Sequence, residues 1–367
     1  MSTRMLLACG ASILCLSATQ AQAEIELGLA TALTGQIAAL GQQSRRGAEA
    51  AIEDINEKGG VLGEELVLTA GDDACDPKQA VALANQFVSD GVEIVIGHLC
   101  SSAAIAAADV YAEEGTVMLT ASATSPALTA KAYDTIFRAC GRDDQQATLA
   151  AELILKQFPD KRIAIVHDKG AYGQGLAMEM EKALANAGVT PAYTGSIAAG
   201  ERDYSALITR LKADNVDVLY YGGYHSELGL IARQAAQQGY DLQLIAADGL
   251  ATDEYWAIAG EAGEGTLFTF SPDPKRNPEI TSILEELRAE GPEPDNFTLY
   301  HYAAVQILAQ AIEEAGSADP EAVAEALHSG TFDTIVGTMQ FDERGDLTKP
   351  DYVFYEWKDG SYDYAAQ

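Results

Sequence analysis

Hydroxyl side chains follow two apolar segments of this chain, at the points where predicted strands end. Ser101 and Ser102 come after the predicted strand 93–97 and the turn that follows it. Thr120 ends the predicted strand 116–120, and Ser122 and Thr124 come just after it. The carboxyl ends of parallel strands meet at one edge of a sheet, and a helix beginning near Ser101 would add free backbone N–H groups. The pattern predicts a site for a small anion such as a carboxylate, although ordinary helix capping uses the same residue types.

One acidic and two aromatic side chains follow strands predicted in the second half of the chain. Asp248 comes after the predicted strand 243–247, and Tyr172 and Tyr224 lie in glycine-rich turns after two earlier strands. A carboxylate or an aromatic face could meet an ammonium group, and the glycines let the backbone approach a ligand closely. A turn aspartate and tyrosines that only pack would give the same pattern, so residue type alone leaves both interpretations open.

Residues for catalysis or metal binding lack the usual spacing. The five histidines form no HExxH pair, and no CxxC motif is present. His98 and the pair His167-Asp168 fall near the predicted site, where a supporting or turn role is favoured over a catalytic one. We therefore expect no catalytic residue, no metal site and no cofactor.

Short apolar segments alternate with longer amphipathic or alanine-rich segments, a pattern typical of parallel sheets covered by helices on both faces. In the first half we predict strands at 25–30, 65–70, 93–97, 116–120 and 135–138, with helices at 41–58, 77–89, 101–113 and a short one near 126–131. In the second half we predict strands at 161–167, 192–197, 216–221, 243–247 and 265–270, with helices at 143–158, 173–187, 203–213, 226–239 and 253–259.

The C-terminal third begins with a proline-rich segment, 271–278, which predicts an extended crossing rather than core. Helices are predicted at 278–289, 296–315 and 320–328, followed by strand, turn and strand in GTMQFDERGDL and a last strand at 352–357. The fold class is therefore α/β, with two doubly wound parallel-sheet lobes joined by a three-strand hinge near 141, 271 and 350. We assign 24–141 plus 271–350 to lobe 1, and 142–270 plus 351–367 to lobe 2.

Composition and the N-terminus indicate an exported protein. With 48% hydrophobic residues the chain can bury a sizeable core, and a net charge of −32 excludes nucleic acid and anionic membrane surfaces as partners. Residues 1–23 read as a cleaved signal peptide, with Arg4, an apolar run and Ala21-Gln22-Ala23. We expect a soluble mature chain from near Glu24.

Removal of residues 1–23 leaves three cysteines. In an oxidising compartment a disulfide bond between Cys75 and Cys100 would make the turn before Ser101 rigid, and it would contribute roughly 3 to 4 kcal/mol on the chain-entropy model. Cys140 is then unpaired, and a partly buried free thiol is favoured over a reactive one.

Five segments together resemble the leucine/isoleucine/valine-binding proteins of bacterial branched-chain amino acid ABC importers, which are type I periplasmic binding proteins. The segments are DDACDPKQAV (72–81), VIGHLCSS (95–102), RIAIVHDKGAYGQGLA (162–177), DVLYYGGYHSELG (217–229) and FDERGDL (341–347). The resemblance covers nearly all of the mature chain. It implies a periplasmic, monomeric protein that closes two lobes on an amino acid and is recognised by a membrane permease with its ATPase.

The resemblance also implies roles for individual residues. Ser101, Ser122 and Thr124 match the positions that hold the carboxylate and ammonium of the ligand, and Asp248 matches the ammonium-binding acid. That acid is typically Glu in the family, and Ser122 stands where Ala is common. Tyr172 and Tyr224 match residues that contact the ligand from the second lobe.

The resemblance places the side-chain pocket on the first lobe. Its predicted lining is Leu99, Cys100 and Ala123, with Leu40 and Phe297 as further candidates. Leu40 stands where the family often carries Tyr, so the preferred aliphatic amino acid is left open.

Two other functions stay open beside amino acid transport. One is an amino acid or amide sensor of the same fold that regulates a signalling partner. The other is a secreted hydrolase that would use His167 and Asp168.

Overall fold

A five-stranded parallel sheet forms the first half of the protein. The computed structural model describes residues 24–366, so the predicted signal peptide at 1–23 lies outside the described residues. The strand order is β2-β1-β3-β4-β5, and the strands are β1 (Glu24–Thr31), β2 (Glu65–Asp72), β3 (Ile94–Gly97), β4 (Val117–Thr120) and β5 (Ile136–Arg138). Thr120, at the end of β4, lies opposite Arg138, at the end of β5.

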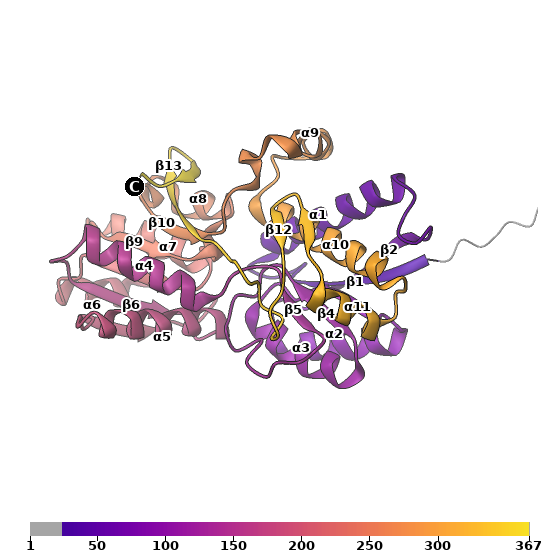
Figure 1. Ribbon diagram of the computed structural model, residues 1–367. Helices are drawn as coiled ribbons and strands as arrows, with labels where there is room; N and C mark the ends of the chain where they lie inside the picture. The colour runs from indigo at the N-terminus through magenta and orange to yellow at the C-terminus, as the bar shows by residue number, and fades with distance from the viewer. Residues whose placement is uncertain (1–23, 367) are drawn as a thin grey trace, which may run out of the picture.

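Helices cover both faces of this sheet, which explains why β3 and β4 consist of buried residues only. The helices are α1 (Ala38–Glu57), α2 (Pro77–Asp90), α3 (Ser101–Glu114), α10 (Asn296–Ala315) and α11 (Pro320–Ser329). The apolar helix α10 packs along α1, so a late segment of the chain returns to the first sheet (Figure 1). A two-stranded ribbon, β11 (Phe332–Thr334) with β12 (Gly337–Met339), follows α11.

The second sheet has seven strands in the order β14-β13-β10-β9-β8-β6-β7. Its strands are β6 (Ile163–His167), β7 (Tyr193–Ser196), β8 (Val218–Gly222), β9 (Gln243–Ala246), β10 (Leu267–Phe270), β13 (Val353–Lys358) and β14 (Ser361–Tyr364). The helices between them are α4 (Asp143–Gln157), α5 (Ala171–Asn186), α6 (Ser205–Ala213), α7 (His225–Gln237) and α8 (Glu254–Ala259). β13 and β14 run antiparallel at one edge, so this sheet is mixed.

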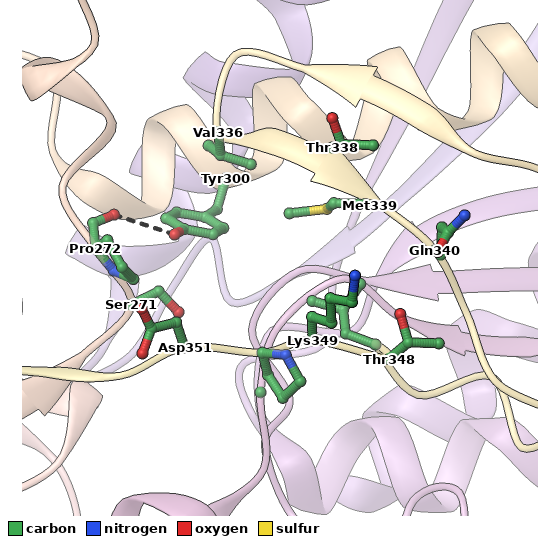
Figure 2. A pocket seen from close by; sticks show the side chains of 13 residues that line it. Ser271, Pro272, Tyr300, Val336, Thr338, Met339, Gln340, Thr348, Lys349 and Asp351 are labelled. Carbon is green, nitrogen blue, oxygen red and sulfur yellow. Dashed lines mark hydrogen bonds between the residues drawn. The ribbon is translucent and has the colours of Figure 1, made fainter.

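The chain passes between the two sheets at 139–142, after β10 near 271, and again near 350 before β13. The second of these passages contains α9 (Thr281–Glu290). A cavity of about 370 Å³ lies beside all three passages and is lined by Gly141, Ser271, Pro272, Tyr300, Met339 and Lys349, among others (Figure 2). None of the predicted ligand-binding residues lines it. The lobe boundaries themselves stay a prediction.

The α/β fold class with parallel sheets is confirmed, and most predicted elements differ from the observed ones by one to three residues at their ends. The predicted helix near 126–131 is wrong: these residues form turns, Thr129 is bonded to the side chains of Arg138 and Asp346, and Ala132 has a positive φ of 50°. The segment GTMQFDERGDL was predicted to form a strand, a turn and a second strand. In the structure β12 pairs with β11, the strand that precedes it, and a single β-bridge joins Phe341 to Leu347. The antiparallel strand β14 was not predicted.

Across residues 24–366, no helix combines the length and the apolar character needed to cross a membrane.

The predicted disulfide bond between Cys75 and Cys100 is present, and Cys140 is a buried free thiol. We expect the double substitution Cys75→Ala with Cys100→Ala to lower the free energy of unfolding by about 3 kcal/mol, because the unfolded chain regains the entropy of an open loop. Urea unfolding with and without reductant measures this. Reductant should destabilise the wild type and leave the double variant unchanged; a loss below about 1 kcal/mol would contradict the prediction.

Candidate functional site

The turn between β3 and α3 presents Leu99 and Ser101 on a rigid support. Cys100 precedes the helix in extended conformation, and its bond to Cys75 ties the turn to the segment after β2. Ser101 is only 2% exposed, and its Oγ accepts a hydrogen bond from the backbone N–H of Ser125 at 3.2 Å. The hydroxyl hydrogen of Ser101 is therefore left to donate to a ligand.

The loop after β4 is held against this turn by Thr120. The Thr120 hydroxyl donates to the His98 carbonyl at 2.9 Å and accepts from the backbone N–H groups of Ser122 (3.2 Å) and Ala123 (3.0 Å). The Ser122 hydroxyl donates to the Leu99 carbonyl at 3.2 Å. Since that bond uses its only hydrogen, Ser122 Oγ can only accept from a ligand.

His98 supports the turn from inside the protein. Its Nδ1 lies 2.6 Å from a carboxylate oxygen of Asp73 and its Nε2 lies 3.2 Å from the Tyr111 hydroxyl, and all three side chains are buried. Because both ring nitrogens are occupied, the structure gives His98 the supporting role that the sequence favoured.

Tyr172 and Tyr224 come together on the second sheet. His167 of β6 lies opposite Gly222 of β8, so the segments that follow these strands leave the sheet side by side. A Cβ atom on Gly173 would lie 2.3 Å from the Gly222 carbonyl oxygen, a contact that only glycine permits. The two tyrosine rings consequently lie 5.1 Å apart. Tyr172 belongs to the first turn of α5 and is buried, whereas the sequence placed it in a glycine-rich turn.

Asp248 begins a short 3-10 helix directly after β9 and is 6% exposed. The Tyr172 hydroxyl donates to Asp248 Oδ1 at 2.6 Å and accepts from the backbone N–H of Gly249 at 3.0 Å. Burial raises the pKa of Asp248 to about 6, and the hydrogen bond from Tyr172 acts in the opposite direction. This carboxyl group therefore keeps its proton to a higher pH than an exposed aspartate does.

These residues meet in one small cavity between the two sheets. It is lined by Leu40, Leu99, Ser101, Ser122, Tyr172, Tyr224, Asp248, Gly249 and Phe297. Cys75 Sγ of the first sheet approaches the Tyr224 hydroxyl to 3.9 Å, so the two walls touch. The cavity measures about 10 Å³, room for about one water molecule. An amino acid can enter only if the walls move apart.

Three predicted residues do not line this cavity. The sulfur of Cys100 is directed to Cys75, and Ala123 and Thr124 are fully buried behind Ser122. Thr124 Oγ1 has no hydrogen-bond partner among the described residues. Their contacts with a ligand stay a prediction.

Asp143 was missed by the sequence interpretation and lies close to the site. It is fully buried at the start of α4, and its N–H donates to the Thr124 carbonyl at 3.0 Å. Burial, and next the charge of Asp248, raise the pKa of Asp143 well above its ordinary range. An aspartate at the start of a helix looks like a capping residue, so no local pattern distinguishes it.

The residues considered for hydrolysis are engaged elsewhere. His167 Nδ1 accepts the backbone N–H of Lys169 at 3.1 Å, and Asp168 Oδ1 accepts that of Gly170 at 2.8 Å. In the part of the chain that the structure describes, no group of three or more His, Cys, Asp or Glu side chains is placed to hold a metal ion.

The bond between Tyr172 and Asp248 can be tested by titration. We expect Tyr172→Phe to raise the pKa of Asp248 from about 6 to about 7, because the ionised carboxylate loses a hydrogen-bond donor. Carbon-13 NMR of carboxyl-labelled protein measures this, with Asp248→Asn assigning the resonance. Tyr220→Phe is the control, since that buried hydroxyl has no hydrogen-bond partner in residues 24–366. An unchanged or lower pKa in Tyr172→Phe would contradict the assigned bond.

Comparison with known proteins agrees with this architecture. Residues 24–361 match the periplasmic binding protein family. A Leu/Ile/Val-binding protein homologue from Brucella melitensis is 47% identical over 351 residues, which cover 95% of each chain. The crystal structure of a leucine binding protein, LivK, from Thermotoga maritima superposes with a TM-score of 0.86 at 31% identity and covers 93% of this chain and 98% of that chain. An ABC transporter substrate-binding protein from Desulfitobacterium hafniense in complex with Leu has a TM-score of 0.77 at 29% identity, covering 94% of this chain and 100% of that one.

The fold, the paired walls of the cavity and these similarities lead to one conclusion: the chain belongs to the periplasmic binding protein family and is similar to its Leu/Ile/Val-binding members.

Proposed function

We propose that this protein binds a branched-chain or related aliphatic amino acid between its two sheets and delivers it to the permease of an ABC importer. The observation that carries the proposal is the composition of the small cavity. It joins a hydroxyl donor, Ser101, and a buried carboxyl group, Asp248, across apolar side chains. A zwitterion with an aliphatic side chain needs these three features together.

The carboxylate of the ligand would lie at the start of α3. Ser101 has a hydroxyl hydrogen to donate, and the first backbone N–H groups of a helix have no partner within the helix. The disulfide bond between Cys75 and Cys100 holds these donors in place. Binding therefore costs little conformational entropy in this turn.

The ammonium group would lie against the opposite wall. Asp248 supplies the negative charge, and Ser122 Oγ supplies a neutral acceptor from the first sheet. Asp143 is close enough for the charge of Asp248 to raise its pKa, so the two carboxyl groups influence each other's ionisation. Desolvation of an ammonium group is compensated only if such acceptors are arranged beforehand.

The aliphatic side chain would pack on Leu40, Leu99 and Phe297, which line the same cavity. Two departures from the usual family pattern bear on which amino acid fits best. Leu40 stands where Tyr is common, and its smaller side chain would enlarge or reshape the pocket; Asp248 is one methylene shorter than Glu. Because each buried CH₂ is worth about 0.8 kcal/mol, such changes are large enough to alter the order of preference among Leu, Ile and Val.

Binding would close the protein. In this structure the two walls touch and the cavity is too small for an amino acid, so the ligand would enter an open form. Contacts of the bound ligand with Asp248 and the two tyrosines would then favour the closed form. We further propose that the protein works as a monomer in the periplasm after removal of residues 1–23, and that it has no catalytic activity.

Calorimetry on refolded protein tests this function. We expect heat of binding with aliphatic amino acids, and we expect Ser101→Ala to weaken binding by about 1 to 3 kcal/mol, because the ligand carboxylate loses a donor. Ser102→Ala is the matched control, since Ser102 does not line the cavity. Binding of no amino acid by the wild type would overturn the proposal, and equal affinity in Ser101→Ala would remove Ser101 from the site.

Affinity should also depend on pH. Between the touching walls burial raises the pKa of Asp248 to about 6; a ligand ammonium beside it favours the ionised form and lowers that pKa in the complex. Binding therefore releases a proton below about pH 6, and affinity should fall by up to about tenfold for each pH unit below that value and level off above it. Titrations from pH 5 to 8 measure this. Asp248→Asn should bind more weakly with a flatter profile; affinity that stays constant or rises toward pH 5 would contradict the ammonium assignment.

A further inference from the structure

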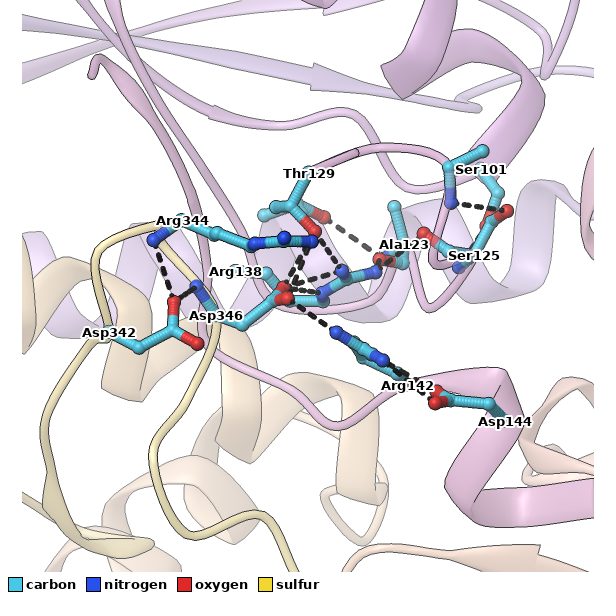
Figure 3. A network of polar contacts seen from close by, with 12 residues as sticks. Ser101, Ala123, Ser125, Thr129, Arg138, Arg142, Asp144, Asp342, Arg344 and Asp346 are labelled. Atoms are coloured by element: carbon cyan, nitrogen blue, oxygen red, sulfur yellow. Dashed lines mark hydrogen bonds and ion pairs between the residues drawn. The ribbon is translucent and has the colours of Figure 1, made fainter. Parts of the chain in front are cut away.

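A buried arginine holds the loop that carries Ser122 and Thr124. The side chain of Arg138 is completely buried, and its guanidinium donates to the carbonyl oxygens of Ala123 at 3.0 Å and Ser125 at 2.8 Å. It also donates to the Thr129 hydroxyl at 2.7 Å and, through Nε, to Asp346 at 2.9 Å (Figure 3). The register that places Arg138 opposite Thr120 explains why the guanidinium lies where this loop begins.

Asp346 completes this network from a distant part of the chain. Its carboxylate accepts from Arg138, from the Thr129 hydroxyl at 2.9 Å and from Arg142 Nη1 at 3.0 Å. Burial alone would raise the pKa of Asp346, but the two arginines outweigh it and hold that pKa below the ordinary range. Asp346 is therefore ionised and neutralises a charge that would otherwise be buried without a partner.

The segment FDERGDL exists in this structure as the turn that presents Asp346. Asp342 Oδ1 accepts from the backbone N–H groups of Arg344 at 2.8 Å and Asp346 at 3.0 Å, and the Arg138 N–H donates to the Gly345 carbonyl at 2.8 Å. Gly345 has a φ of 80°, and a Cβ atom there would lie 2.1 Å from the Ile136 carbonyl oxygen. The turn thus docks directly on β5.

These hydrogen bonds fix the backbone of one particular segment, residues 123–125. The two carbonyls that Arg138 binds belong to the residues on either side of Thr124, and the Thr124 carbonyl itself accepts from Asp143. The backbone of residues 123–125 is consequently held from both sides, next to the cavity wall formed by Ser122. Arg142 also belongs to this network, because its side chain donates to Asp346. Arg142 is the residue just before α4, where the chain passes to the second sheet.

We infer that Arg138 and Asp346 are positioning residues for amino acid binding. Their buried ion pair fixes the 122–125 loop so that Ser122 keeps the orientation that the ligand ammonium requires. This role rests on the proposed function, because it assigns the pair to a site where an amino acid binds. Neither residue touches the ligand.

Affinity and stability measured on the same variants test the inference. We expect Arg138→Met and Asp346→Asn to weaken leucine binding at least about tenfold, the loss seen when residues that orient a binding group are removed. Arg138→Lys should weaken it as well, since one ammonium group cannot hold two carbonyls and a carboxylate in the same plane. Arg46→Met is the matched control: Arg46 also donates to two backbone carbonyls, those of Leu287 and Pro292, but it does not line the cavity. It should lower Tm and leave Kd within about twofold of the wild type.

The smaller substitution Thr129→Val keeps the inference testable where an arginine variant fails to fold. It removes only the hydroxyl that links Arg138 to Asp346, and it should give a Kd between those of the wild type and Asp346→Asn. Faster hydrogen exchange at the amides of residues 122–125 should accompany the loss of affinity. Lower Tm with unchanged Kd in Thr129→Val and Asp346→Asn would overturn the positioning role alone, whereas failure of the wild type and Arg46→Met to bind any amino acid would overturn the proposed function and this inference with it.

Discussion

The site depends on keeping carboxyl groups buried where two sheets meet. Asp248 and Asp143 are both buried, and each raises the cost of ionising the other. The structure limits this cost with few donors: the Tyr172 hydroxyl on Asp248 and the Gln146 amide on Asp143 at 3.2 Å. A cation placed beside Asp248 would relieve the remaining cost, and this is the physical basis for the proposal that the ligand carries an ammonium group.

The two walls of the cavity are built differently. The wall from the first sheet is braced by a disulfide bond, by the Thr120 hydroxyl, by His98 with Asp73, and by the Arg138–Asp346 pair. The wall from the second sheet depends on the contact between Gly173 and Gly222, which brings two tyrosines together beside Asp248. In the proposed function, the first wall is the rigid platform that would receive the ligand, and the second wall is the surface that would close over it.

Much of this could be predicted from the sequence, because the relevant patterns are local. The buried strands β3 and β4 are short apolar runs. Ser101 follows the carboxyl end of β3 in the first sheet, and Asp248 follows the carboxyl end of β9 in the second sheet. The remainder depends on contacts between distant segments. Arg138 and Asp346 are 208 positions apart, and nothing around either residue indicates that they pair. Asp143 resembles a helix cap, and the segment 126–131 forms turns because Thr129 is drawn into the Arg138 network instead of extending a helix.

The central claim is that one cavity recognises both charged ends of an amino acid and its aliphatic side chain. Calorimetric titration with leucine, with 4-methylpentanoate, which lacks the amine, and with 3-methylbutylamine, which lacks the carboxylate, tests it most directly. The account predicts that leucine binds at least about a hundredfold more tightly than either analogue, because each analogue leaves a buried charged or donor group unpaired. Equal affinity for leucine and one of the analogues would contradict it.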